Sequence, residues 1–419
     1  MARKHWSWYA AALALALALL PFAVPLLAAA YAVVWVYTWT HDPRARAHFV
    51  AVLPVDPRRV LRCGRALWAG MLDGLGAPTP ALVLAFVRSR LSRAARTQDT
   101  AVRDIQYGPL ALHRLDLFVP LATATRAVVV VFPGYRWTRT RRARMYRPMA
   151  QTLCGDGLFV VLPRVGAGLG ALADFHVAVQ WVAANAANFG ADASRVHVMG
   201  CGAGAHLCAM YSLAAPLRTW YAQADRVARG AQLLQDAAAD AALRRAVRPI
   251  RAAPRLAGLV LVSGVFDVVA QRRYEAARCI EHLTAAARAF APGEEEAWSP
   301  ALIVRALRRR SAVLPPELFP RAALLVHGRH DSTFELAQSQ RMFRELCAVG
   351  VPDVQMKVYA NLRRVDPAIA LLAPRSALAQ SLLEDIRNSV EGADRSEANR
   401  QGDEKPPHDE TLGTPNHDA

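Results

Sequence analysis

The segment Gly200–Gly204 (GCGAG) has the residue types and the spacing of a sharp turn from a strand into a helix. It follows Val196–Met199, a short apolar run that is typical of a buried strand. When serine stands at the centre of such a turn, the bend exposes its hydroxyl as a nucleophile for acyl transfer, and the outer glycines permit close packing. In this chain the central residue is Gly202, so the pattern predicts the turn without its nucleophilic side chain.

Cys201 is the alternative nucleophile in this turn. If Cys201 were the apex, Met199 and Ala203 would take the flanking positions that require small residues. They match these positions less well than Gly200 and Gly204 do around Gly202. The residue before the apex also normally points away from the site. The other interpretation of Cys201 is a small packed thiol.

The elements that must position this turn alternate between strand and helix. Apolar runs bounded by turn residues predict strands at His113–Pro120, Ala127–Phe132, Gly157–Leu162, Val196–Met199, Leu259–Val262, Ala323–Val326 and Val354–Tyr359. Helical spacing predicts helices over Ala171–Asn188 and Glu335–Val349, and a further helix after Gly204. We therefore predict an α/β fold, in which helices cover both faces of a mostly parallel sheet.

The charge of the chain is strongly positive but lacks a nucleic-acid motif. Its 419 residues carry 51 Lys and Arg against 34 Asp and Glu, a formal net charge of +17, and only three of the basic residues are lysines. Arginine and alanine are abundant along the whole chain, which indicates a composition bias. We therefore expect no nucleic-acid partner, and we attribute the charge to solvated surface or to a face near anionic lipid.

Six cysteines are present without a C-x-x-C pair or a zinc-ligand spacing. We interpret them as free thiols, either buried or in a reducing compartment. The sequence predicts neither a metal nor a cofactor.

The N-terminal run Trp6–Thr40 contains 35 residues and no charge. A membrane span needs about 20 apolar residues, so the run predicts one tilted or kinked span, or a pair of short spans. A cleaved signal peptide ending near Ala28–Ala30 is the alternative, although the apolar run continues beyond that point. The arginines that follow the run favour a cytosolic position for the rest of the chain.

These patterns divide the chain into five parts. The expected boundaries are an N-terminal flank at 1–5, a transmembrane segment at 6–40, a basic membrane-proximal helical region at 41–100, an α/β domain at 101–390 with a helical insertion and possible cap at 218–255, and a disordered acidic tail at 391–419.

From about Gln106 to Val390 the chain resembles the α/β-hydrolase esterases and lipases, and most of all the isoprenylcysteine methylesterase group. The matching stretches are YGPLALHRLDLFVP at 107–120, VVVVFPGYRW at 128–137, NFGADASRVHVMGCGAGAHL at 188–207, LVLVSGVFDV at 259–268, PGEEEAWSPALIV at 292–304 and LLVHGRHD at 324–331. The resemblance implies an α/β-hydrolase fold and carboxylic-ester chemistry. It also implies a membrane of the endoplasmic reticulum or Golgi, and a prenylated or acyl ligand.

Carried over position by position, the resemblance implies a degenerate catalytic triad. Gly202 stands at the nucleophile position, Asp331 at the acid position, and Arg364 at the histidine position. An arginine stays protonated and cannot act as a general base. The oxyanion-loop positions are Gly134, Tyr135 and Ala203.

Four further polar residues near these positions have alternative roles. His206 and His327 belong to family motifs, and we interpret both as packed histidines of the core. His330 and Ser332 flank Asp331 and could act as a base or a nucleophile, or could simply be surface-loop residues.

The resemblance leaves two functions open. The chain is either a pseudoenzyme with a binding or scaffolding role, or an ester hydrolase with a non-standard nucleophile. In the first case, Arg364 would form a salt bridge with Asp331 or bind an acidic group, such as the free carboxylate of a prenylated cysteine.

Overall fold

The computed structural model describes most of the α/β domain and parts of the N-terminal region. The described residues are 25–39, 56–74, 100–121, 126–132, 137, 146–166, 168–227, 231–310, 315–360, 362, 371 and 377–403.

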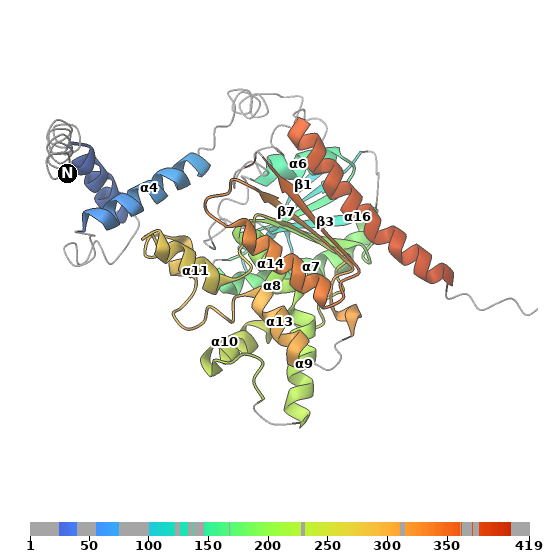
Figure 1. Cartoon of the computed structure of the whole chain (residues 1–419). Coiled ribbons are helices and arrows are strands. Elements are labelled where there is room, and N and C mark those ends of the chain that lie inside the picture. The colour runs from blue at the N-terminus through green and yellow to red at the C-terminus, as the bar shows by residue number, and fades with distance from the viewer. Residues whose placement is uncertain are drawn as a thin grey trace, which may run out of the picture.

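An eight-stranded sheet forms the centre of the molecule (Figure 1). Its strand order is β1-β2-β4-β3-β5-β6-β7-β8. The first two pairings, β1 with β2 and β2 with β4, are antiparallel, and all the others are parallel. The strands are β1 (Thr100–Gln106), β2 (Arg114–Val119), β3 (Val128–Phe132), β4 (Phe159–Pro163), β5 (Val196–Cys201), β6 (Gly258–Val262), β7 (Ala322–Gly328) and β8 (Asp353–Tyr359).

The interior strands are apolar along their whole length because both of their faces are covered. All five residues of β3 are buried, and they alternate between two cores. Val128, Val130 and Phe132 belong to one core, whereas Val129 and Val131 belong to the other. The carboxyl ends of β3, β5, β6 and β7 meet at one edge of the sheet, and ligands of open α/β sheets bind at such an edge.

Helices cover the two faces of the sheet (Figure 1). One face carries α7 (Ala171–Asn185), α8 (Ala203–Ser212), α13 (Pro300–Arg310) and α14 (Leu336–Ala348), and the other carries α6 (Arg147–Gly155) and α16 (Ala377–Asp403). Further helices among the described residues are α4 (Pro57–Gly74), α9 (Ala214–Val227), α10 (Ala237–Val247), α11 (Val268–Ala277) and α12 (Ala285–Ala289). The predicted mostly parallel sheet with helices on both faces is therefore confirmed.

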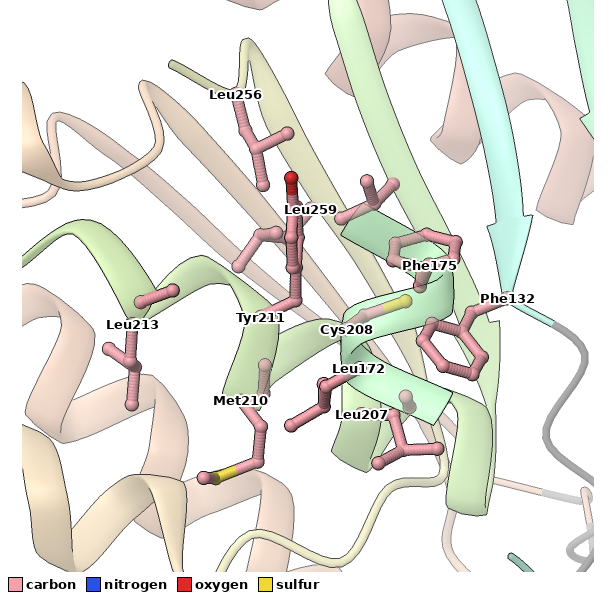
Figure 2. Packing of buried hydrophobic residues seen from close by; sticks show 14 of the residues in the cluster. Phe132, Leu172, Phe175, Leu207, Cys208, Met210, Tyr211, Leu213, Leu256 and Leu259 are labelled. Carbon is pink, nitrogen blue, oxygen red and sulfur yellow. The ribbon is translucent and has the colours of Figure 1, made fainter. Parts of the chain in front are cut away.

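Helix α8 is the innermost helix, and all ten of its residues are buried. Figure 2 shows Cys208 of α8 beside Phe175 of α7 and Phe132 of β3. The ring centroids of Phe132 and Phe175 are 4.1 Å apart. Because α8 is packed on every side, its first turn is held firmly against the carboxyl end of β5.

Two predicted boundaries differ from the structure. Helix α16 continues to Asp403, so residues 391–403 of the predicted disordered tail are helical. Their Ala, Glu and Arg residues favour helix, and they extend a helix that is already docked by Leu382, Ile386 and Val390. The predicted insertion at 218–255 is the α9–α10 region, and α9 begins at the carboxyl end of α8, away from Gly202.

The described part of the N-terminal region is helical. Residues 25–39 form a helix, and α4 lies within the predicted basic region. No helix among the described residues is both long and apolar enough to cross a membrane. Most of the predicted transmembrane run lies outside the described residues.

Candidate active site

The turn between β5 and α8 has an unusual backbone at its apex. Gly202 has φ 58° and ψ −116°, a conformation that residues with a β-carbon rarely adopt. The Gly202 amide donates to the Val262 carbonyl at 2.8 Å, and the Gly202 carbonyl accepts from the His206 amide at 3.1 Å. The apex is therefore bonded both to the neighbouring strand and to the helix that follows it.

Gly200 permits this turn by its lack of a side chain. A β-carbon at Gly200 would lie 2.3 Å from the carbonyl carbon of Gly204 and 2.5 Å from the Ala205 nitrogen. The backbone at position 200 lies too close to the backbone of Gly204 and Ala205 for any residue with a side chain at position 200. The predicted sharp turn therefore exists, with Gly202 at its apex.

Ala203 is the first residue of α8 and is buried. The amides of the first helical turn have no partner within their helix, so they are suited to an anionic oxygen. Ala203 thus begins the helix as predicted, and its role as an oxyanion donor stays a prediction. The other two predicted oxyanion-loop positions, Gly134 and Tyr135, lie outside the described residues.

Asp331 lies in the loop after β7, and its side chain is fully buried. Its Oδ1 accepts from the amides of Thr333 and Phe334, both at 2.9 Å. These two bonds fix the carboxylate at the carboxyl edge of the sheet, where Gly202 also lies. Arg364 is outside the described residues, so the predicted Asp331–Arg364 pair remains a prediction.

The two motif histidines are held by hydrogen bonds within the core. The His206 Nδ1 accepts from the Trp137 Nε1 at 3.0 Å, and the His206 Nε2 donates to the Trp298 carbonyl at 2.8 Å. Burial lowers the pKa of His206 to about 4. His327 contacts the Ser339 hydroxyl at 2.8 Å and the Phe334 carbonyl at 3.1 Å. Both rings therefore have structural partners at both nitrogens.

Cys201 packs against the core on the α6 and α16 face of the sheet. Burial raises the pKa of its thiol to about 12. Since the thiolate is the nucleophile, a thiol with this pKa is almost unreactive at neutral pH. Of the residues that flank Asp331, His330 is exposed, and the Ser332 carbonyl accepts from the Tyr274 hydroxyl at 2.8 Å.

An aromatic wall, which sequence reasoning missed, lies beside the apex. It consists of Trp137, His206, Phe290 and Trp298. The Trp137 ring meets Phe290 edge-on at 5.1 Å, and the His206 ring meets Phe290 at 5.4 Å. His206 is one helical turn after Gly202, and all four side chains are buried, so this wall is part of the core that supports the turn. The only sequence signal was the match of these residues to family motifs.

Ser263 is a second site residue that the sequence analysis missed. It follows β6 with φ 46°, and its amide donates to the Val326 carbonyl at 2.8 Å. Its hydroxyl is buried and has no hydrogen-bond partner among the described residues. Because Val262 bonds to Gly202, Ser263 lies at the strand end next to the apex. A serine directly after a predicted strand was the available signal.

Across the described ranges, no group of three or more His, Cys, Asp or Glu side chains is arranged to hold a metal ion.

Three solved structures share this fold at low sequence identity. Esterase B from Lactobacillus rhamnosis has a TM-score of 0.53 at 15% identity, over 77% of this chain and 98% of that chain. A truncated carbohydrate esterase from gut microbiota has a TM-score of 0.50 at 15% identity, over 71% and 98%. Carboxyl esterase 2 from Tuber melanosporum has a TM-score of 0.50 at 17% identity, over 71% and 87%.

The chain therefore has the α/β-hydrolase fold of these esterases. The family model BD-FAE matches residues 115–229, which include Gly202 but neither Asp331 nor Arg364. No curated protein matches the chain. The family model covers about a quarter of the chain, and the structural likeness shows the fold.

Proposed function

We propose that this protein is a pseudoenzyme of the α/β-hydrolase superfamily, which binds an acyl or prenyl ligand and does not hydrolyse it by serine chemistry. The observation that carries the proposal is Gly202. Its backbone makes the turn that presents a nucleophile, with φ 58° and ψ −116°, and it offers no side chain.

The chemistry that remains supports binding rather than turnover. Acyl transfer in this fold needs a nucleophile and a base that activates it. Position 202 lacks the first, and position 364 holds an arginine instead of the second. In a serine protease, loss of the triad lowers turnover on the order of a millionfold, although the oxyanion donors and substrate binding remain.

The features that favour a ligand are the buried Asp331 and the amide of Ala203, since a carboxylate or carbonyl oxygen fits a helix N-terminus. The resemblance to isoprenylcysteine methylesterases rests on sequence motifs. It suggests a prenylated cysteine as the ligand, with Arg364 binding its carboxylate.

The proposal includes attachment to a membrane of the endoplasmic reticulum or Golgi, with the hydrolase domain in the cytosol. It is supported by the uncharged run Trp6–Thr40 and by the exposed apolar residues Leu26, Val33 and Val36 on the helix over residues 25–39. Removal of residues 1–40 should release the protein from carbonate-washed membranes. Persistent retention of the truncated chain would argue against this attachment.

A working ester hydrolase is the second candidate function, and Ser263 is the observation that favours it. A serine in a rare backbone conformation with a buried, unpartnered hydroxyl is found at functional sites more often than elsewhere. However, the side chain is only 1% exposed, and no described histidine bonds to it. This candidate requires a base that lies outside the described residues.

Ester hydrolysis by the purified full-length protein distinguishes the two candidates. The substrate is a short-chain nitrophenyl ester, and the variants are Gly202→Ser, Arg364→His and the double variant. Gly202→Ala is the matched control, because it adds a β-carbon at the apex without a nucleophile. We expect hydrolysis only from the double variant. Turnover by the unaltered protein that disappears in Ser263→Ala would instead establish the second candidate.

A further inference from the structure

The junction between α4 and the hydrolase domain contains two cysteines. Cys63 on α4 is fully buried in a small apolar cluster with Val34, Val60 and Leu283. Cys279, which follows α11, packs against the same cluster. These two residues are 216 positions apart in the chain, and the fold brings both to the same apolar cluster.

The neighbouring contacts show that the two segments lie in register. Arg59 is one helical turn before Cys63, and Glu281 is two residues after Cys279. The Arg59 guanidinium and the Glu281 carboxylate are 3.1 Å apart. The ion pair and the shared apolar cluster thus bring the same two stretches of chain together.

The backbone at Cys279 is a second, independent observation. Helix α11 ends in a Schellman motif, in which the Cys279 amide donates to Ala276 at 2.9 Å and the Ile280 amide donates to Glu275 at 3.1 Å. The residue at this position is usually glycine, since its φ is positive. Cys279 has φ 57°, which is unfavourable for a residue with a β-carbon. Cysteine therefore stands at a position where glycine would adopt the same backbone at a lower steric cost.

The ionisation of Cys63 agrees with this proximity. Burial raises the pKa of Cys63 to about 12, and the next largest cause is the nearby Cys279. The effect of Cys279 exceeds that of Glu281 or Arg59, although both of those side chains lie at the same junction.

We propose that Cys63 and Cys279 form a reversible disulfide that fastens α4 to the hydrolase domain. Cys279 is the partly exposed thiol, so it reacts first with a small disulfide such as oxidised glutathione. Its thiolate attacks one sulfur, and one reduced glutathione leaves. The Cys63 thiolate then attacks the Cys279 sulfur of the mixed disulfide and releases the second glutathione. Since burial raises the pKa of Cys63 to about 12, its thiolate is rare, and this step relies on holding the two sulfurs in one cluster. The two thiol protons end on the two glutathione molecules.

The disulfide would change how the N-terminal region is attached to the domain. In the reduced form, the described contacts between α4 and the domain are the small cluster and the Arg59–Glu281 pair, which is half exposed at Arg59. A surface ion pair adds little to the free energy that holds this junction together. The disulfide converts it into a covalent link.

The test uses reduced full-length protein that is incubated with oxidised glutathione, alkylated with N-ethylmaleimide, digested and analysed by mass spectrometry. We expect a peptide pair joined through Cys63 and Cys279, and its loss on treatment with dithiothreitol. Cys279 carrying only glutathione, while Cys63 is alkylated after unfolding, would overturn the proposal. So would a link of either residue to the exposed Cys347.

Two variants keep the test decisive. Cys279→Gly suits the backbone at this position and should fold, but it cannot form the link. Cys347→Ser removes an exposed thiol elsewhere and should leave the link intact. Oxidation should raise the Tm of the unaltered protein and of Cys347→Ser, and should leave that of Cys279→Gly unchanged. An equal Tm rise in Cys279→Gly would contradict the proposal.

Discussion

The Gly202 amide donates a 2.8 Å hydrogen bond to the Val262 carbonyl, so the apex of the turn is tied to the neighbouring strand although it carries no side chain. The same strand ends in Ser263, whose amide is bonded in turn to Val326 of β7. The ends of β5, β6 and β7 therefore form one connected edge. The backbone turn is well fixed at this edge, and its apex carries no side chain.

The close packing at Gly200 leads to the first prediction. Gly200→Ala should lower the free energy of unfolding by about 3 kcal/mol, because its β-carbon meets backbone atoms that cannot move aside. Gly155→Ala is the matched control, since nothing lies within 4 Å of a β-carbon there and alanine favours the α6 helix. Urea unfolding of both variants measures the difference. A Gly200→Ala protein as stable as Gly155→Ala would mean that the turn is not packed as described.

Ser263 provides the second prediction. Ser263→Gly should raise the free energy of unfolding by about 1 kcal/mol, because glycine adopts φ 46° without the steric cost that serine has. Ser263→Ala keeps that cost and removes the unpartnered hydroxyl, so the pair separates the two effects. Chemical denaturation is again the measurement. If Ser263→Gly is no more stable than Ser263→Ala, the positive φ carries no steric cost here. If Ser263→Ala is less stable than the unaltered protein, the hydroxyl makes a favourable contact in the folded protein.

The third prediction concerns His197, whose ring is buried in β5. Burial, aided by the positive charges of Arg195 and Arg321, lowers its pKa from 6.5 to about 3. Between these values the unfolded chain binds a proton that the folded chain excludes. This residue therefore makes the free energy of unfolding fall as the pH is lowered through that window, by at most roughly 1.4 kcal/mol per pH unit. Above about pH 6.5 its contribution is constant.

His197→Gln should reduce this slope, because glutamine does not titrate. His197→Leu should reduce it equally and also remove the Nε2 atom, which has no hydrogen-bond partner among the described residues. Unfolding curves from pH 4 to pH 8 make the comparison. An unchanged slope in both variants would show that His197 is not buried in its neutral form.

Cys201 yields the fourth prediction. With a pKa of about 12, its thiol should react with iodoacetamide at pH 7.5 roughly a thousandfold more slowly than an ordinary thiol. The exposed Cys347 is the internal standard, and peptide mass spectrometry follows both residues in one sample. Cys201 labelling as fast as Cys347 labelling would restore Cys201 as a candidate nucleophile.

The sequence predicts the interior strands well, because a strand buried on both faces is apolar at every position. All five residues of β3 and all five of β6 follow this rule. The edge strand β1 was not predicted, since TAVRDIQ has only β2 as a neighbour and contains a register shift between Val102 and Ile105. Its pairing, rather than its composition, makes it a strand.

At the site, the local spacing of residues predicts the turn, whereas tertiary contacts determine the backbone of Ser263 and the hydrogen-bond partners of His206. The glycines at 200 and 204 are visible in the sequence, and so is the apex residue at 202, which lacks a side chain. The strained backbone of Ser263 arises from its position between β5 and β7, which no local pattern reveals. The partners of His206, Trp137 and Trp298, are 69 and 92 residues away in the chain, so the sequence offers only the motif histidine itself.

The most direct test of the missing nucleophile is the intact mass of the full-length protein after treatment with a fluorophosphonate, a reagent that esterifies activated serines. We predict no adduct on the unaltered protein, and one adduct, at residue 202, on the Gly202→Ser, Arg364→His double variant. One full equivalent of adduct on the unaltered protein, at Ser263 or at any other residue, would contradict the proposal that this chain is a pseudoenzyme.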